Sequence, residues 1–205
     1  MPGANHTKMA LAQSLQDLMN TMPLEKISVN DIVEHAGMGR NTFYYHFEDK
    51  YDLVNWYFQT GMTHFLASRM NFGSWEDMLN SAEEYFRENR VFYTNALSYT
   101  GQNSLRSYIF DFVREIFAQR AQDCTAQEQD PLSPADLRFL GDFLAGGLMG
   151  ILQQWVDHGM KEHITDYYHG MQRICSTPLL QQFFQLEDEE LAHPGHVVPG
   201  DASAE

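Results

Sequence analysis

The segment from Ser28 to Phe47 constrains the fold of this chain more than any other. Apolar residues recur after Ser28 at the spacing of a helix with one buried face. Ser28 and Asp31 form a Ser-x-x-Asp pair, in which side-chain oxygens accept hydrogen bonds from free amides at a helix start. Gly37 predicts the end of that helix, because glycine adopts the left-handed conformation of a helix stop without steric cost. Gly39 can then occupy the cap position of a second helix.

That second helix is short and is predicted to run from Arg40 to Phe47. Phe43 and Phe47 are four residues apart, so they share one face and would pack inward. Two helices joined by a short glycine-containing turn form a helix-turn-helix, whose second helix enters the major groove of DNA. An ordinary helical hairpin is the alternative. Aromatic, amide and basic side chains crowd the outward positions, however, and this favours DNA binding over a merely solvated surface.

The outward residues themselves suggest how such a helix would contact DNA. Thr42, Tyr44 and Tyr45 offer hydroxyl groups to phosphates. Arg40 and Asn41, at the N-terminus of the helix, can reach the edges of bases.

Residues 7 to 58 resemble the N-terminal domain of TetR-family transcriptional regulators. The resemblance rests on Ala36-Gly37, on Thr42-Phe43-Tyr44-Tyr45-His46-Phe47 and on Lys50-Tyr51-Asp52-Leu53. Many relatives have Ser where this chain has Gly39, so the hydroxyl that would cap the helix is absent. Position by position, the family's pattern implies that Arg40, Asn41 and Tyr45 discriminate between DNA sequences. It implies that phosphates are held by Ser28, Thr42, Tyr44, His46 and Lys50.

A second stretch, from Phe143 to Trp155, is similar to the branch of the family that contains regulators of dihydroxyacetone-kinase operons. The resemblance implies a homodimer that binds a palindromic operator in double-stranded DNA. It implies a repressor released by a signal, or, through the branch resemblance, an activator. The effector would be a small molecule or a partner protein in the C-terminal domain.

The charge of the chain limits how it could bind DNA. The formal net charge is -15, whereas phosphate attraction normally requires a basic surface. Residues 1 to 55 hold four Lys or Arg and seven Asp or Glu, a difference of -3, so most of the acid lies elsewhere. We therefore expect weak non-specific binding, with affinity resting on helix N-termini, hydroxyl groups and base contacts.

The composition is that of a globular protein, with 43% hydrophobic and 13% aromatic residues. No apolar run is long enough for a membrane span, and the N-terminus lacks a secretion signal. We therefore expect a cytoplasmic protein without a membrane partner. The two cysteines, Cys124 and Cys175, lie far apart and lack the spacing of a zinc site, so both are expected to be buried or incidental thiols.

Helical periodicity predicts an all-α fold without strands or repeats. We expect a DNA-binding domain at 1–50, a helical ligand-binding and dimerisation domain at 51–186, and an acidic, disordered tail at 187–205. The predicted helices cover 7–22, 50–70, 74–88, 89–98, a segment from Asn103 or Ser104 that ends before Cys124, 133–158, and a segment capped by Thr165. Residues 122–134 are expected to be a surface loop. The helix that begins at Lys50 would act as a lever between the two domains.

Three other chemistries were weighed against DNA binding. The glycines between Gly146 and Gly150 lie in a helical pattern, so close helix packing explains them better than a phosphate loop. Cys175 lacks the sequence context of a nucleophile. A loose group of possible metal ligands comprises His158, Glu162, His163, Asp166 and His169. A solvated loop explains this group better, so neither a metal, a cofactor nor an enzyme activity is predicted.

A two-fold interface is predicted on the helix at 133–158. Apolar residues recur along it at helical spacing, and glycines would let a second backbone approach. Alternatively, these apolar residues could pack in the core of a single chain. The predicted interface residues are Leu140, Leu144, Gly147, Leu148, Ile151 and Trp155.

An effector site is predicted among the many aromatic residues between Trp56 and Tyr108. Packing in the core is the ordinary role of any one of them. Together they could line a cavity with apolar walls and a few hydroxyl groups, the usual composition of a small-molecule site. The four residues chosen are Trp56, Phe65, Tyr93 and Tyr108.

Overall fold

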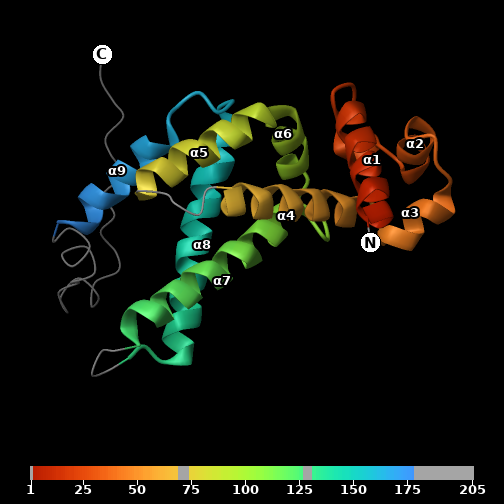
Figure 1. The fold of residues 1–205 in the computed structure, drawn as a ribbon. Helices are drawn as coiled ribbons and strands as arrows, with labels where there is room; N and C mark the ends of the chain where they lie inside the picture. Colours follow the sequence, from red (N-terminus) through yellow and green to blue (C-terminus); the bar gives the residue numbers. More distant parts are fainter. Residues whose placement is uncertain (1, 69–73, 127–130, 178–205) are drawn as a thin grey trace, which may run out of the picture. The chain divides into compact units, whose positions relative to one another are not determined.

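The computed structural model describes residues 2–68, 74–126 and 131–177, and all regular structure in these ranges is helical. The all-α prediction is therefore confirmed. The elements are α1 (Pro2–Met19), the 3-10 helix η1 (Leu24–Lys26), α2 (Val29–His35), α3 (Arg40–His46), α4 (Lys50–Ser68), α5 (Trp75–Glu88), α6 (Arg90–Ser98), α7 (Leu105–Thr125), α8 (Pro134–Asp157) and α9 (Ile164–Cys175) (Figure 1). The predicted tail at 187–205 lies outside the described residues.

The chain forms two compact units, residues 1–164 and residues 165–205. The first unit contains α1 to α8. In the second, the described residues form most of α9, where the Tyr168 hydroxyl accepts a hydrogen bond of 2.7 Å from Nε2 of Gln172. Because α9 begins at Ile164, Thr165 lies inside the helix and does not cap it.

Helices α1, α2 and α3 form a three-helix group at the N-terminus. Leu11, Leu15 and Met19 of α1 are buried and supply its core. Ser14, also buried, donates from its hydroxyl to the carbonyl oxygen of Ile32 at 2.7 Å, which ties α1 to α2. Helix α1 ends three residues before the predicted end at position 22.

Helix α1 also contacts α4 and α6, so the three-helix group packs directly on the rest of the first unit (Figure 1). Helices α4, α5 and α6 enclose a core of aromatic side chains. Phe58 of α4 and Phe92 and Tyr93 of α6 are buried there, with Phe86 of α5. Ser74 caps α5 by accepting a hydrogen bond from the Asp77 amide, as its sequence predicted.

Helices α7 and α8 pack along each other as a hairpin (Figure 1). Ser104 caps α7 and Ser133 caps α8, the latter in a reciprocal pair with Asp136. Helix α7 continues through Cys124, which is exposed, to Thr125. The predicted loop at 122–134 therefore starts later than expected, because the polar residues after Arg120 extend the exposed face of the helix.

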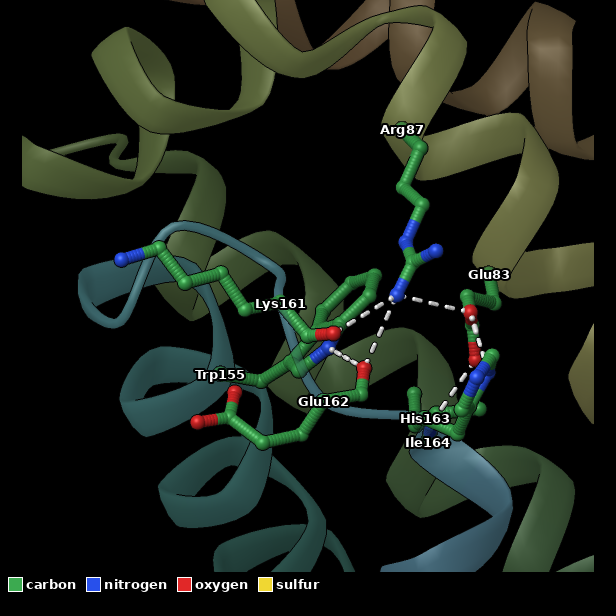
Figure 2. A network of polar contacts seen from close by, with 7 residues as sticks. All are labelled: Glu83, Arg87, Trp155, Lys161, Glu162, His163 and Ile164. Carbon is green, nitrogen blue, oxygen red and sulfur yellow. Dashed lines mark hydrogen bonds and ion pairs between the residues drawn. The ribbon is translucent and has the colours of Figure 1, made fainter.

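A polar network joins α5 to the segment that follows α8 (Figure 2). Glu83 is 5% exposed, and its carboxylate pairs with Arg87 at 2.9 Å and with His163 at 3.1 Å. Arg87 also donates to the carbonyl oxygen of Glu162 at 3.0 Å, and the same oxygen accepts from the Trp155 indole at 2.8 Å. A buried carboxylate is tolerated because each oxygen has a partner. The network therefore fixes the segment between α8 and α9.

His163 belongs to this network through its contact with Glu83. Across the described parts of the chain, no group of three or more His, Cys, Asp or Glu is arranged to hold a metal ion. The glycine-rich stretch lies inside the continuous helix α8, which excludes a phosphate loop there. Among the described residues, no helix is both long and apolar enough to cross a membrane.

Candidate nucleic-acid interface

The turn between α2 and α3 has the geometry that its sequence predicts. Gly37 has a φ of +65°, the left-handed conformation that favours glycine. The amide of Met38 donates to the carbonyl oxygen of Val33 at 2.8 Å, which closes the end of α2. Gly39 is extended and caps α3 without a side-chain hydrogen bond. The backbone conformation of this turn thus joins the two helices within a few residues.

One face of α3 anchors the helix in the three-helix group. Phe43 is fully buried and Phe47 is 3% exposed, and their ring centroids lie 5.7 Å apart. His35 of α2 contacts the Ser14 hydroxyl at 3.1 Å and adds a polar link to α1. The inward packing predicted for the two phenylalanines is confirmed.

The opposite face of α3 points to solvent. Tyr45 is 83% exposed and Tyr44 is 49% exposed, although large aromatic side chains are normally covered. Arg40 and Asn41 are exposed at the start of the helix, and the guanidinium of Arg40 lies 5.8 Å from the centre of the Tyr44 ring. This arrangement presents a cation, an amide and two phenols side by side on a rigid helix.

Thr42 and His46 complete the predicted contact set on α3, and both are half-buried. The His46 ring lies edge-on to Tyr45, with centroids 4.9 Å apart. Their polar atoms therefore flank the exposed face.

Ser28 is exposed, but its hydroxyl is used by the protein itself. The hydroxyl donates to Oδ2 of Asp31 at 2.7 Å, and the Asp31 amide donates back to the hydroxyl oxygen at 3.2 Å. The hydrogen bond from the Ser28 backbone amide, followed by the one from its hydroxyl, lowers the pKa of Asp31. The predicted capping pair is confirmed, and a phosphate would compete with Asp31 for the hydroxyl hydrogen.

Lys50, the first residue of α4, is also engaged. Its ammonium group donates to the carbonyl oxygens of Leu24 at 2.7 Å, Glu25 at 2.9 Å and Ile27 at 2.6 Å. Burial lowers the pKa of Lys50, partly offset by the nearby carboxylate of Glu25. An ammonium has three donors, and all three have acceptors here. The predicted phosphate contact would require one of these bonds to break.

The four predicted effector residues do not form a single cluster. Trp56 lies against the three-helix group, where its ring is 5.7 Å from that of Phe47 and 5.4 Å from the Lys8 ammonium. The other three are connected through two residues that were not selected, Phe58 and Tyr85. Phe58 lies 6.4 Å from Tyr93 and 6.0 Å from Tyr108, and Tyr85 lies 5.7 Å from Phe65 and 6.0 Å from Tyr93.

We call Phe58, Phe65, Tyr85, Tyr93 and Tyr108 the aromatic cluster. Tyr93 is fully buried, and its hydroxyl has no hydrogen-bond partner of normal geometry among the described residues. Burial raises the pKa of Tyr93 well above its ordinary value, and burial also raises that of Tyr85. Both phenols are therefore neutral groups within an apolar core.

The predicted dimer residues share one stripe of α8 but differ in burial. Trp155 is fully buried in the core of its own chain, and Leu140, Leu144, Leu148 and Ile151 are half-buried. Gly147 alone is exposed. The side of α8 that faces α7 includes Gly141, where an added methyl group would lie 3.0 Å from the carbonyl oxygen of Arg114.

The outward face of α8 has a different composition, which the periodicity of the leucines obscured. Phe139 and Phe143 are 71% and 66% exposed, and their rings stack with centroids 6.2 Å apart. Gly146, Gly147 and Gly150 follow on the same side, with open space above each. We call these five residues the outer face of α8. Their spacing of three and four residues could have identified it in the sequence.

Comparison with known proteins decides the family. A model described as "Bacterial regulatory proteins, tetR family" matches residues 17–56, and one described as "Transcriptional regulator C-terminal region" matches residues 73–177. The chain belongs to the TetR family. The first match covers the helix-turn-helix, and the second covers α5 to α9, so the resemblance noted in the sequence is confirmed.

Two bacterial transcriptional regulators are similar to this chain in sequence. The HTH-type dhaKLM operon transcriptional activator DhaS of Lactococcus lactis is 30% identical over 87 residues, 42% of this chain and 46% of that protein. The HTH-type transcriptional regulator SAR2658 of Staphylococcus aureus is 27% identical over 120 residues, 56% of this chain and 65% of that protein. The alignments thus span about half to two thirds of these relatives' lengths.

A solved structure with the TetR-family fold, the dihydroxyacetone kinase operon activator DhaS, is also similar. Its TM-score is 0.57 at 20% identity, over 89% of this chain and 98% of that chain. The similarity supports the two-part helical fold. All these matches are to transcriptional regulators, so the prediction that this TetR-family chain is not an enzyme is confirmed.

Proposed function

We propose that this chain regulates transcription by inserting α3 into the major groove of operator DNA. The observation that supports this most directly is the exposure of Tyr45, 83%, on a helix whose other face is anchored by the fully buried Phe43. Arg40, Asn41 and Tyr45 would discriminate between bases. This order of roles follows from their position at the start and centre of the outward face.

Phosphate contacts are assigned to Tyr44, which lies on that face, and to Thr42 and His46, which flank it. Ser28 and Lys50 are assigned instead to holding α2 and η1, because their hydrogens already have acceptors in the protein. The net charge of -15 keeps non-specific attraction to DNA weak, so most of the affinity would come from these contacts.

The test uses a DNA duplex that the purified wild-type protein selects from a random pool. Asn41→Ala should weaken binding by about 1–3 kcal/mol and relax base preference, since one base contact is worth this much. Thr42→Ala should weaken binding to all duplexes alike. Asn30→Ala, an exposed residue on α2, is the matched control and should bind as the wild type. Unchanged affinity in gel shifts at fixed salt for both Arg40→Ala and Asn41→Ala would contradict this docking.

We further propose a homodimer that binds a palindromic operator. The outer face of α8 supports this, because two exposed phenylalanines and three glycines would let a second copy of the helix approach closely. A two-fold axis through such a face would make the interface self-complementary. Two copies of α3 would then contact half-sites about one helical turn or more apart.

We propose that a small, neutral or weakly polar molecule binds in the aromatic cluster and acts as the signal. The hydroxyl of Tyr93, which has no hydrogen-bond partner of normal geometry among the described residues, would form a hydrogen bond with such a ligand, while the surrounding rings supply apolar contact. Trp56 is assigned to the contact between α4 and α3 instead. Thermal-shift screening of a metabolite library, with and without the selected duplex, tests this. If no compound raises the melting temperature, a protein partner becomes the favoured signal.

Repression of transcription is the first candidate for the direction of control. Activation is the second, and the description of the Lactococcus lactis relative as an activator favours it. Transcript levels of the genes beside selected genomic sites distinguish the two in a deletion strain, because they rise after loss of a repressor and fall after loss of an activator.

We propose that the protein acts in the cytoplasm. We also retain the proposed division into a DNA-binding domain at 1–50 and a ligand-binding and dimerisation domain at 51–186.

A further inference from the structure

The side chain of Asn95, on α6, contacts the connection between α1 and α2. Its Nδ2 donates to the carbonyl oxygen of Met19 at 3.1 Å. Its Oδ1 accepts from the backbone amide of Leu24 at 3.2 Å. One amide side chain therefore bridges the end of α1 and the start of η1, across more than 70 residues of sequence.

Lys50 contacts the same connection from α4. Its three donors bind the carbonyl oxygens of Leu24 and Glu25 in η1 and of Ile27, the residue that follows η1. The backbone of η1 is thus held by one side chain from α6 and one from α4.

Within the described parts of the chain, the backbone groups that Asn95 binds have no second hydrogen-bond partner. The carbonyl oxygen of Met19 lies at the C-terminus of α1, and the amide of Leu24 lies at the start of η1, where helices leave such groups unpaired. Both residues are 2% exposed, so water is largely excluded from their side chains. Removal of Asn95 would leave a buried donor and a buried acceptor unsatisfied.

Helix η1 leads directly into the DNA-contacting helices. Ile27, whose carbonyl oxygen accepts a hydrogen bond from Lys50, directly precedes Ser28, the residue that caps α2. Helix α2 in turn is joined to α3 by the tight turn at Gly37. A displacement of η1 would therefore change the orientation of α2 and α3 together.

Helix α6 also reaches the aromatic cluster. Tyr93 precedes Asn95 by two residues, about 3 Å along a helix axis. Ala96 and Leu97, which follow Asn95, are buried, so α6 is firmly packed on both sides of this contact. A change in the packing of the aromatic cluster around Tyr93 would thus be transmitted to η1 through one short helix, α6.

We propose that Asn95 is a positioning residue. Its two hydrogen bonds hold η1 at a fixed position against α6, and this position orients α2 and α3 for DNA binding. Lys50 is its counterpart on α4. The route from the second part of the fold to the DNA-contacting helices therefore runs through α6 as well as through the expected lever, α4. The consequence for DNA rests on the proposed function, whereas the contact between α6 and η1 does not.

The first experiment measures hydrogen exchange on the purified full chain. Asn95→Ala should speed exchange of backbone amides between Leu24 and Ile32 by about tenfold, the usual effect of losing a hydrogen bond to a buried group. Asn95→Asp keeps an acceptor for the Leu24 amide, so that amide should stay protected while the end of α1 exchanges faster. If the alanine variant does not fold, hydrogen exchange of the aspartate variant tests the proposal.

Two control variants separate positioning from general destabilisation. Thr94→Ala changes an exposed neighbour on α6 and should leave exchange unchanged. Ile109→Val removes a buried methyl group from α7, so it should lower the melting temperature without selectively speeding exchange at 24–32. Unchanged exchange at 24–32 in Asn95→Ala, or an equal increase in Ile109→Val, would overturn the proposal.

The second experiment measures DNA recognition with the selected duplex and a scrambled one. Asn95→Ala should reduce the ratio of the two affinities severalfold, with the same dependence on salt, because no phosphate contact is lost. An unchanged ratio would overturn the role in DNA recognition. If the wild-type protein selects no duplex, the proposed function fails, and the exchange data still decide whether Asn95 positions η1.

Discussion

Asp31 illustrates how one carboxylate can stabilise the start of a helix. Its carboxylate accepts hydrogen bonds from both the backbone amide and the hydroxyl of Ser28, at 2.8 and 2.7 Å. Both bonds favour the charged form and lower the pKa of Asp31. Since α2 supports α3, this local pair contributes to the geometry of the proposed DNA interface.

The pKa of Asp31 predicts a pH dependence with a definite sign. A carboxylate whose folded-state pKa is lowered stabilises the fold at neutral pH, and this contribution is lost as pH falls through the folded-state pKa. Asp31→Asn should therefore lower the melting temperature at pH 7, and the difference from the wild type should shrink as pH falls below about 4. Melting curves of both proteins across this range test it. A constant difference at all pH values would contradict the assignment.

At the scale of elements, the contact between α4 and α5 depends on Gly61. A methyl group at this position would overlap the hydroxyl oxygen of Tyr85 and lie 3.2 Å from its ring carbon Cζ. Tyr85 in turn packs against Phe65 and Tyr93, so it has little room to move. The small size of Gly61 thus sets how closely the two helices approach beside the aromatic cluster.

Gly61→Ala should therefore destabilise the fold, although alanine is the better helix former by about 0.5–1 kcal/mol. Overpacking of a core typically costs about 1–3 kcal/mol, which outweighs that gain. Tyr85→Phe removes the overlapping oxygen, so Gly61→Ala in this background should be neutral or stabilising. Urea unfolding of the two single variants and the double variant measures the effect. Equal destabilisation in both backgrounds would show that the hydroxyl is not responsible.

At the scale of the whole molecule, the proposed dimer would present two copies of α3 to DNA. Gly147→Arg places a charge on the outer face of α8, where open space lets the isolated chain fold normally. In a two-fold interface the unpaired charge would cost about 3–5 kcal/mol and weaken the dimer at least about a hundredfold. Gln59→Arg, on the exposed side of α4, adds the same charge elsewhere.

Sedimentation velocity at micromolar concentration compares these two variants with the wild type. We expect a folded monomer with reduced affinity for the selected duplex from Gly147→Arg, and an unchanged dimer from Gln59→Arg. Phe143→Arg should behave as Gly147→Arg does, since both positions lie on the outer face. A dimer that persists in both α8 variants would assign the interface to another surface.

The local features of this protein could be predicted from its sequence because their causes lie within a few residues. Ser28, Ser74 and Ser133 each cap a helix by accepting a hydrogen bond from the backbone amide of an aspartate three positions later, and such pairs need no distant partner. Gly37 takes a positive φ for a reason that belongs to glycine alone. The inward face of α3 followed from the spacing of Phe43 and Phe47. These signals, with the family's motif, were sufficient for the all-α fold and the helix-turn-helix.

Only the tertiary structure decided which partners the polar and aromatic side chains find. Lys50 has the same sequence context whether its ammonium meets phosphate or the carbonyl groups of η1, and Asn95 bonds to residues more than 70 positions away. Trp56 was predicted to line the effector site, but its ring packs on Phe47. Helix α8 is apolar on two sides, so periodicity could not determine which side α7 would cover. Distant contacts depend on how the helices pack against one another, and helical spacing along the chain contains no information about that choice.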